Sequence, residues 1–229
     1  MQDVRVLNNR REAPDAHTLI LEKPEGFRFK AGQYVLLQTP INGRPLRRSY
    51  SLASAPHEEK LHITIRTQPQ GRVSPALAKL TTKDTIGVLG PVGEFTRGDE
   101  EHSVFVAAGA GITPFISMLR EAKHQNNNTK TTILYTNKTP QQELYSQELE
   151  LHAQQEHVNL HKTITRPLPG YQGRTGRLNQ QDLKEHLNDN TVFYLCGSND
   201  MVRAFTTKLL ELGATPEQIR TENYGNVHA

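Results

Sequence analysis

Cysteine is almost absent from this sequence. Among 229 residues the only cysteine is Cys196, so the chain can form no internal disulfide and no four-thiolate iron–sulfur or zinc site. The ten histidines are scattered, and the nearest approach to a group is His152, His157 and His161, which span an expected helix end and a strand. We therefore expect no metal centre.

Long apolar runs and a strong charge of one sign are also lacking. The longest apolar run, residues 104–110, is far too short to cross a bilayer, and the N-terminus has no apolar segment typical of a secretory signal. Lys and Arg number 27 against 24 Asp and Glu, and a formal charge of +3 is no nucleic-acid signature. These absences predict a cytoplasmic protein without nucleic-acid or membrane partners.

The length allows one large domain or two domains of about 100 residues each. Up to about residue 98 the pattern predicts short strands separated by proline and glycine turns. The clearest strand is 61–66, in which Leu61, Ile63 and Ile65 alternate with polar residues. One helix interrupts this region, with Ser74 as its N-cap. Such a pattern predicts an antiparallel barrel or sandwich, with strands at 17–22, 32–37, 61–66 and 84–89.

A tight turn at 90–95 and a polar stretch at 97–101 predict a domain boundary, giving domains 1–98 and 99–229. Beyond it, residues 103–108 are apolar on both faces, as in a strand inside a parallel sheet. Strands and helices then alternate, which predicts an α/β doubly wound parallel sheet. The further strands are expected at 131–135, 158–164, 191–196 and 219–222, with helices beginning near residues 113, 139, 179 and 198.

The stretch 47–54 contains chemistry suited to a flavin dinucleotide. Arg48 can form two parallel charge-assisted hydrogen bonds with a pyrophosphate, Tyr50 can lie along an aromatic ring system, and Ser51 can donate to a ring heteroatom. In a strand Arg48 and Tyr50 share one face, and Ser49 and Ser51 share the other. The alternative is an ordinary edge strand with a solvated arginine.

Gly71 precedes the helix that begins near Ser74. A glycine turn before a helix N-terminus presents backbone N–H groups to an anion such as a pyrophosphate. A plain connecting helix is the alternative.

Two strand ends in the second half also carry a small-residue loop. Gly109-Ala110-Gly111 follows one strand, with Thr113 as the expected N-cap and Pro114 as the first helical residue. The proline replaces the third glycine of the dinucleotide fingerprint of ordinary dehydrogenases. Cys196-Gly197 ends another strand, and Cys196 equally suits a buried packing position. Ligands of open parallel sheets bind beyond such carboxyl ends.

Taken together and in order, these motifs resemble those of the ferredoxin–NADP reductase superfamily, in its flavodoxin and ferredoxin reductase-like branch. The resemblance covers nearly the whole chain. It implies an N-terminal Greek-key β-barrel that binds FAD and a C-terminal domain that binds NAD(P). The matching segments are 48–51, 71–74, 90–95, 109–114, 196–197 and 222–224.

The resemblance also implies a role for each matched residue. Ser51, Cys196, Glu222 and Tyr224 would be catalytic, with Tyr224 covering one flavin face. Thr113 would lie between flavin and nicotinamide. The cofactor-binding residues would be Arg48, Ser49, Tyr50, Ser51, Ile65, Arg66, Gly71, Arg72, Val73, Ser74, Gly109, Ala110, Gly111, Thr113, Pro114, Cys196 and Gly197.

The implied activity is electron transfer from NADH or NADPH through FAD to a separate acceptor such as ferredoxin, flavodoxin or an oxygenase component. Recognition of a 2′-phosphate needs cationic or hydroxyl partners after the second strand of the sheet. Asn137 and Lys138 lie there, and Arg166 and Arg174 follow the third strand, although solvated surface residues are the alternative. No arginine directly follows Tyr135, which favours NADH. Two alternatives remain: a reductase of free flavin, and a non-catalytic NAD(P)H-sensing subunit, against which the single cysteine argues.

Overall fold

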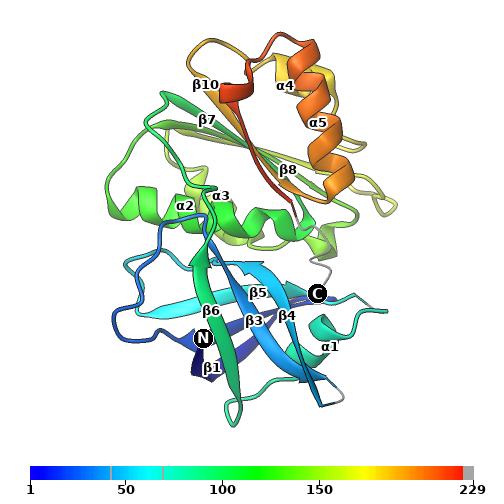
Figure 1. Cartoon of the computed structure of the whole chain (residues 1–229). Coiled ribbons are helices and arrows are strands. Elements are labelled where there is room, and N and C mark those ends of the chain that lie inside the picture. The colour runs from blue at the N-terminus through cyan, green and yellow to red at the C-terminus, as the bar shows by residue number, and fades with distance from the viewer. Residues whose placement is uncertain (42, 69, 224–229) are drawn as a thin grey trace. The chain divides into compact units, whose positions relative to one another are not determined.

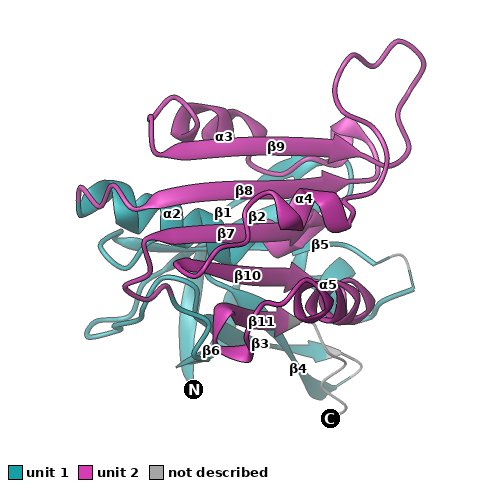
Figure 2. Cartoon of the chain, turned by 90° about the horizontal axis from the view of Figure 1, so that it is seen from above, with its two compact units in different colours: residues 1–96, 113–125, 226–229 teal, residues 97–112, 126–225 magenta. Residues whose placement is uncertain are grey.

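The computed structural model describes residues 1–41, 43–68 and 70–223. These residues divide into two compact units. Unit 1 comprises the described residues of 1–96 together with 113–125, and unit 2 comprises 97–112 and 126–223 (Figure 2). The domain ranges 1–98 and 99–229 stay a prediction.

Unit 1 is built on one six-stranded antiparallel sheet, with the strand order β4-β3-β6-β1-β2-β5 (Figure 1). A bridge between Leu52, which directly follows β4, and Ile63 in β5 joins the two ends of this order. The sheet is therefore closed into a barrel, which is one of the two architectures that the strand pattern predicts and the one that the family resemblance implies. The strands are β1 (Gln2–Ala13), β2 (Ala16–Glu22), β3 (Tyr34–Ile41), β4 (Arg44–Ser51), β5 (Lys60–Arg66) and β6 (Thr85–Val92).

The alternating apolar residues of the strands form the core of unit 1. Leu61, Ile63 and Ile65 of β5 are fully buried, as their spacing predicts. The short helix α1 (Val73–Leu77) adds its first and last side chains to the same core. Helix α2 (Thr113–His124) also belongs to this unit, and its Phe115 ring packs 5.7 Å from that of Phe95.

Three local features of unit 1 differ from the sequence prediction. Strand β1 was not predicted, because mostly polar residues surround its buried Val4 and Val6. Strand β6 continues to Val92, through the glycine and proline that predicted a turn. Ser74 is not an N-cap: it lies inside α1, and its hydroxyl accepts a hydrogen bond from the backbone N–H of Gln68 at 3.0 Å.

Unit 2 is a five-stranded parallel sheet with the order β11-β10-β7-β8-β9. Helices α4 and α5 lie on one face and α3 on the other, so the predicted doubly wound architecture is confirmed (Figure 1). The elements are β7 (His102–Ala108), β8 (Lys130–Asn137), α3 (Ser146–His152), β9 (Val158–Ile164), α4 (Gln180–Lys184), β10 (Thr191–Gly197), α5 (Asn199–Glu211) and β11 (Ile219–Asn223).

Helix starts in the second half of the chain were predicted with mixed success. Asn179 and Ser198 precede α4 and α5, and each side chain accepts a hydrogen bond from a backbone N–H of the first turn. Thr139 precedes only a 3-10 turn, Pro140–Gln142, and does not cap it. Thr113 is not an N-cap but the first residue of α2, which continues directly from the 3-10 turn η1 (Gly109–Ile112).

Within the described ranges, no helix is both long and apolar enough to cross a membrane.

Candidate flavin and nucleotide site

Strand β4 contains residues 48–51, the first of the two segments predicted to bind the flavin dinucleotide in unit 1. Tyr50 packs against the barrel core, and this burial raises the pKa of its phenol to about 12. The half-buried Arg48 lies on the same face, as the strand period predicts. Its Nη1 donates to the carbonyl oxygen of Arg47 at 2.7 Å.

Ser51, the last residue of β4, carries a buried hydroxyl. The residue is 3% exposed, and its Oγ has no hydrogen-bond partner among the described residues. A buried hydroxyl without a partner costs free energy, so such an atom marks a place where a ligand atom can complete the hydrogen bonding. The donor capacity of Ser51 therefore fits a flavin heteroatom or carbonyl oxygen.

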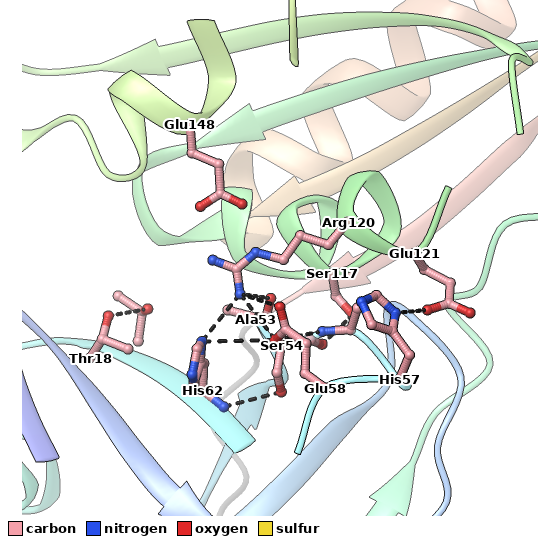
Figure 3. A network of polar contacts seen from close by, with 12 residues as sticks. Thr18, Ala53, Ser54, His57, Glu58, His62, Ser117, Arg120, Glu121 and Glu148 are labelled. Carbon is pink, nitrogen blue, oxygen red and sulfur yellow. Dashed lines mark hydrogen bonds and ion pairs between the residues drawn. The ribbon is translucent and has the colours of Figure 1, made fainter. Parts of the chain in front are cut away.

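The chain directly after Ser51 is fixed by helix α2 (Figure 3). Ser117 Oγ donates to the carbonyl oxygen of Ser54 at 2.7 Å, and Arg120 Nη1 donates to that of Ala53 at 3.2 Å. Sequence reasoning missed both side chains, since they lie more than 60 residues from their partners. The available signal was a serine within the otherwise apolar run 115–119.

The second predicted segment, residues 71–74, includes the start of α1, and Arg66 at the end of β5 precedes it. Arg66 Nη1 donates to both carboxylate oxygens of Asp15 at 2.8 Å, and Gly71 N donates to the carbonyl of Gln68 at 2.8 Å. Arg72 is exposed, whereas Val73 belongs to the core, as does Ile65 at the end of β5. Because α1 has only five residues, it has no developed helix dipole, and Pro75 has no N–H, so the predicted phosphate contacts would come from the backbone N–H groups that flank Pro75.

In unit 2 the glycine loop after β7 packs tightly on the end of β10. A Cβ at Gly111 would lie 2.1 Å from the carbonyl oxygen of Cys196, so only glycine fits there. The phenol of Tyr135 donates to the carbonyl of Gly109 at 3.1 Å, which holds the start of the loop. Thr113 and Pro114, after the loop, are buried. The predicted position of Thr113 beside the two rings stays a prediction.

Cys196 and Glu222 are neighbours in the sheet, because they are register partners across β10 and β11. Cys196 is fully buried, and Glu222 Oε2 is buried without a hydrogen-bond partner in the described part of the chain. Burial raises the pKa of the Glu222 carboxyl to about 7. An acid with this pKa can hold or release a proton near neutral pH. Tyr224, the fourth predicted catalytic residue, lies outside the described residues.

The residues expected to select NADH or NADPH follow β8 and β9. Asn137 is buried, and its carbonyl oxygen accepts from Thr165 N at 2.9 Å. Lys138 and Arg166 are exposed, whereas Arg174 is ion-paired with Asp182. Only part of this basic group is thus available to a 2′-phosphate without breaking an existing ion pair.

Among residues 1–41, 43–68 and 70–223, no group of three or more histidine, cysteine, aspartate or glutamate side chains is arranged to hold a metal ion.

The chain matches two domain families, one in each half. Residues 5–96 match the oxidoreductase FAD-binding domain, and residues 105–207 match the oxidoreductase NAD-binding domain. A closed barrel with the first match and a parallel sheet with the second define an FAD-containing, NAD(P)H-dependent oxidoreductase.

Relatives agree with this class. Ferredoxin–NADP reductase B of Sorangium cellulosum is 30% identical over 97% of both chains. NADH-cytochrome b5 reductase 1 of Neosartorya fischeri is 30% identical over 80% of this chain, which spans only 64% of that relative. A solved ferredoxin NADP+ reductase from Neisseria gonorrhoeae, with bound FAD and NADP, has a TM-score of 0.86 at 24% identity and 98% coverage of both chains. The chain belongs to the ferredoxin reductase-like superfamily, which confirms the resemblance in its motifs.

Proposed function

We propose that this chain takes a hydride from NADH, or less readily from NADPH, and passes electrons through FAD to a separate acceptor protein. FAD supplies the redox chemistry when it is bound, because it accepts a hydride and releases single electrons. Residues 1–98 would form the FAD-binding domain and residues 99–229 the NAD(P)-binding domain. The observation that carries the proposal is the buried Ser51 hydroxyl, which has no hydrogen-bond partner in the described part of the chain and ends the strand that also carries Arg48 and Tyr50.

Each half contributes its own residues. In unit 1, Arg48 and the backbone of the loop at Gly71 would bind the pyrophosphate, Tyr50 would pack along the flavin, and Ser51 would donate a hydrogen bond to it. In unit 2, the loop 109–112 and Gly197 would receive the nucleotide. Cys196 would orient the nicotinamide, and Glu222 would hold a proton near it.

Charge supports an acidic acceptor. Unit 1 has 16 Lys and Arg against 10 Asp and Glu, a formal charge of +6, whereas unit 2 has 11 against 14, a formal charge of −3. A basic flavin unit attracts an acidic electron carrier and speeds its encounter, an effect that salt weakens. Ferredoxin, flavodoxin and an oxygenase component are the acceptors that we propose to test.

The proposal is tested by the visible spectrum of the purified protein without oxygen, before and after NADH and then NADPH are added. A flavin spectrum that bleaches supports the proposal, and the faster donor is the preferred one. A flavin spectrum that neither donor bleaches would contradict it and indicate a non-catalytic NAD(P)H-sensing subunit. A colourless protein that binds added FAD weakly and turns it over would indicate a free-flavin reductase.

The acceptor is tested in a second assay. The reduced protein is mixed with each candidate acceptor at low and at high salt. The proposed acceptor is reduced fastest at low salt, and its apparent KM rises several-fold over the salt range.

A further inference from the structure

The segment 52–55, which directly follows Ser51, is fully buried, and its backbone polar groups are bonded on several sides. Leu52 N donates to the carbonyl of Gln33 at 3.0 Å, and Ala53 N donates to that of His62 at 2.8 Å. These bonds tie the segment to the barrel. They leave the carbonyl oxygens of Ala53 and Ser54 to be satisfied by other groups, because a buried carbonyl without a partner is costly.

Helix α2 supplies those groups. Ser117 is fully buried, and its Oγ bonds the Ser54 carbonyl at 2.7 Å. Arg120 Nη1 bonds the Ala53 carbonyl at 3.2 Å and also contacts the Glu58 carboxylate at 3.3 and 3.4 Å. Figure 3 shows these side chains converging on the segment from one helix.

The Arg120 guanidinium is held in place by a network rather than by one bond. His62 Nδ1 lies 3.2 Å from Arg120 Nη1, and because a guanidinium can only donate, Nδ1 accepts in the tautomer that forms this hydrogen bond. The Glu58 carboxylate, besides pairing with Arg120, accepts from Ala55 N at 3.2 Å. The Arg120 side chain is 16% exposed, so its charge is mostly shielded from water and its geometry is restricted.

We propose that Arg120 and Ser117 are positioning residues for the flavin: they fix the segment that sets the direction of the Ser51 hydroxyl. The inference rests on the proposed role of Ser51. A hydrogen bond weakens steeply when its angle departs from linearity, so a small shift of residues 52–54 would misdirect Ser51 Oγ. A group held this way need not touch the flavin to affect its reduction.

The test is a double-mutant cycle between Ser51→Ala and Arg120→Met. Each variant is purified with FAD, and the rate of flavin reduction by NADH and the flavin midpoint potential are measured. We expect each single substitution to slow reduction about tenfold, and the double variant to be slowed about tenfold as well, because both remove the same hydrogen bond. Arg120→Lys, which keeps a donor, should restore most of the rate.

Arg5→Met is the matched control, since Arg5 pairs with Glu22 on the exposed surface of the same unit and is far along the chain from the network. It should leave both readouts unchanged. Ser117→Ala is made in parallel, and it tests whether α2 positions Ser51 if Arg120→Met does not fold. Ser117→Ala should slow flavin reduction about threefold alone, and by a smaller factor in the Ser51→Ala background.

The outcomes separate the two ideas. If Ser51→Ala leaves the rate and the potential unchanged, the proposed role of Ser51 is wrong, and the inference falls with it. The second outcome is that Ser51→Ala slows reduction, and the double variant is slowed by the product of the two single effects. The two residues then act independently, so Ser51 keeps its role and the inference alone is overturned.

Discussion

The two units prepare their ligand sites in different ways. In unit 1, polar side chains such as Arg48 and Ser51 project from a strand, and the Ser51 hydroxyl is left without a partner among the described residues. In unit 2, the loop 109–112 lies against the end of β10 with space only for glycine at Gly111. On the proposed function, side chains would bind most of the flavin in the first unit, whereas closely packed backbone would receive much of the nucleotide in the second. Loss of the Arg48 side chain should therefore affect cofactor retention, whereas substitutions at Gly111 and Cys196 should affect stability or rate.

The largest effect is expected from Gly111→Ala. The new methyl would overlap the carbonyl of Cys196, and backbone cannot move aside as a side chain can. The free energy of unfolding should fall by about 3 kcal/mol in urea denaturation. Gly197→Ala is the control, because its methyl would press on the flexible thioether of Met201 and would meet Ala108 Cβ only at an ordinary contact distance of 3.4 Å, so it should cost less. Equal costs would contradict the tight backbone packing.

Arg48→Ala should weaken FAD binding about 100-fold, because two charge-assisted hydrogen bonds to the pyrophosphate are lost. The measure is the flavin-to-protein absorbance ratio after purification, followed by titration of the apoprotein with FAD. Arg47→Ala is the matched control: Arg47 is the adjacent, exposed arginine, which bonds Gln38 Oε1 at 2.7 Å. Stoichiometric FAD in the Arg48 variant would show that the residue is misassigned.

Glu222 should make stability pH-dependent. Burial raises its folded-state pKa from 4.5 to about 7, so the folded state binds the proton more tightly than the unfolded state. Its contribution to stability is fully present below pH 4.5 and is lost as the pH rises through about 7. The loss, on the order of 2 kcal/mol, should disappear in Glu222→Gln, as measured by urea unfolding at pH 5 and 8.

The control for this pH dependence is Glu217→Gln, because hydrogen bonds lower the pKa of the exposed Glu217 and it titrates below the tested range. An unchanged pH dependence in Glu222→Gln would assign the effect to another group.

The smallest effect is expected from Cys196→Ala. Reduction of the flavin by NADH should slow by about tenfold or less while FAD remains stoichiometric, because the loss concerns orientation of the nicotinamide. Stopped-flow reduction is the measurement, with Cys196→Ser as the variant that keeps the side-chain volume. If neither variant changes the rate, Cys196 is a packing residue, and unit 2 contributes through its backbone alone.

Much of the fold was predictable, because it depends on local pattern. The alternation in β5 and the apolar run of β7 place those strands correctly, and the ordered motifs identify the superfamily. Strand β1 was missed since its polar sequence resembles a loop. Its antiparallel pairing with β2 and β6 on either side stabilises the strand that its own pattern does not predict.

The candidate site was predictable only at residues whose own side chains have a suitable functional group within a motif, as with Ser51 and Glu222. The Asp15 carboxylate that holds Arg66, and the Arg120 guanidinium that holds Ala53, come from distant parts of the chain. Neither Asp15 nor Arg120 lies within a sequence motif, so the sequence gives no sign of these two contacts. The reason why residue 111 is a glycine was also only partly predicted. The sequence predicted that the loop backbone approaches a phosphate, and the structure shows that the backbone at Gly111 lies against the backbone of Cys196.

Helix α2 has a further consequence for how the chain is synthesised and cut. It completes unit 1, yet it is encoded after β7, the first strand of unit 2. A nascent chain that has emerged only to residue 96 therefore lacks the α2 side chains that contact Phe95, Ala53 and Ser54. About thirty more residues must be synthesised before α2 can cover this part of the barrel. A protease that cuts near residue 97 would likewise release no complete unit, because the described residues of each unit come from separate stretches of the chain.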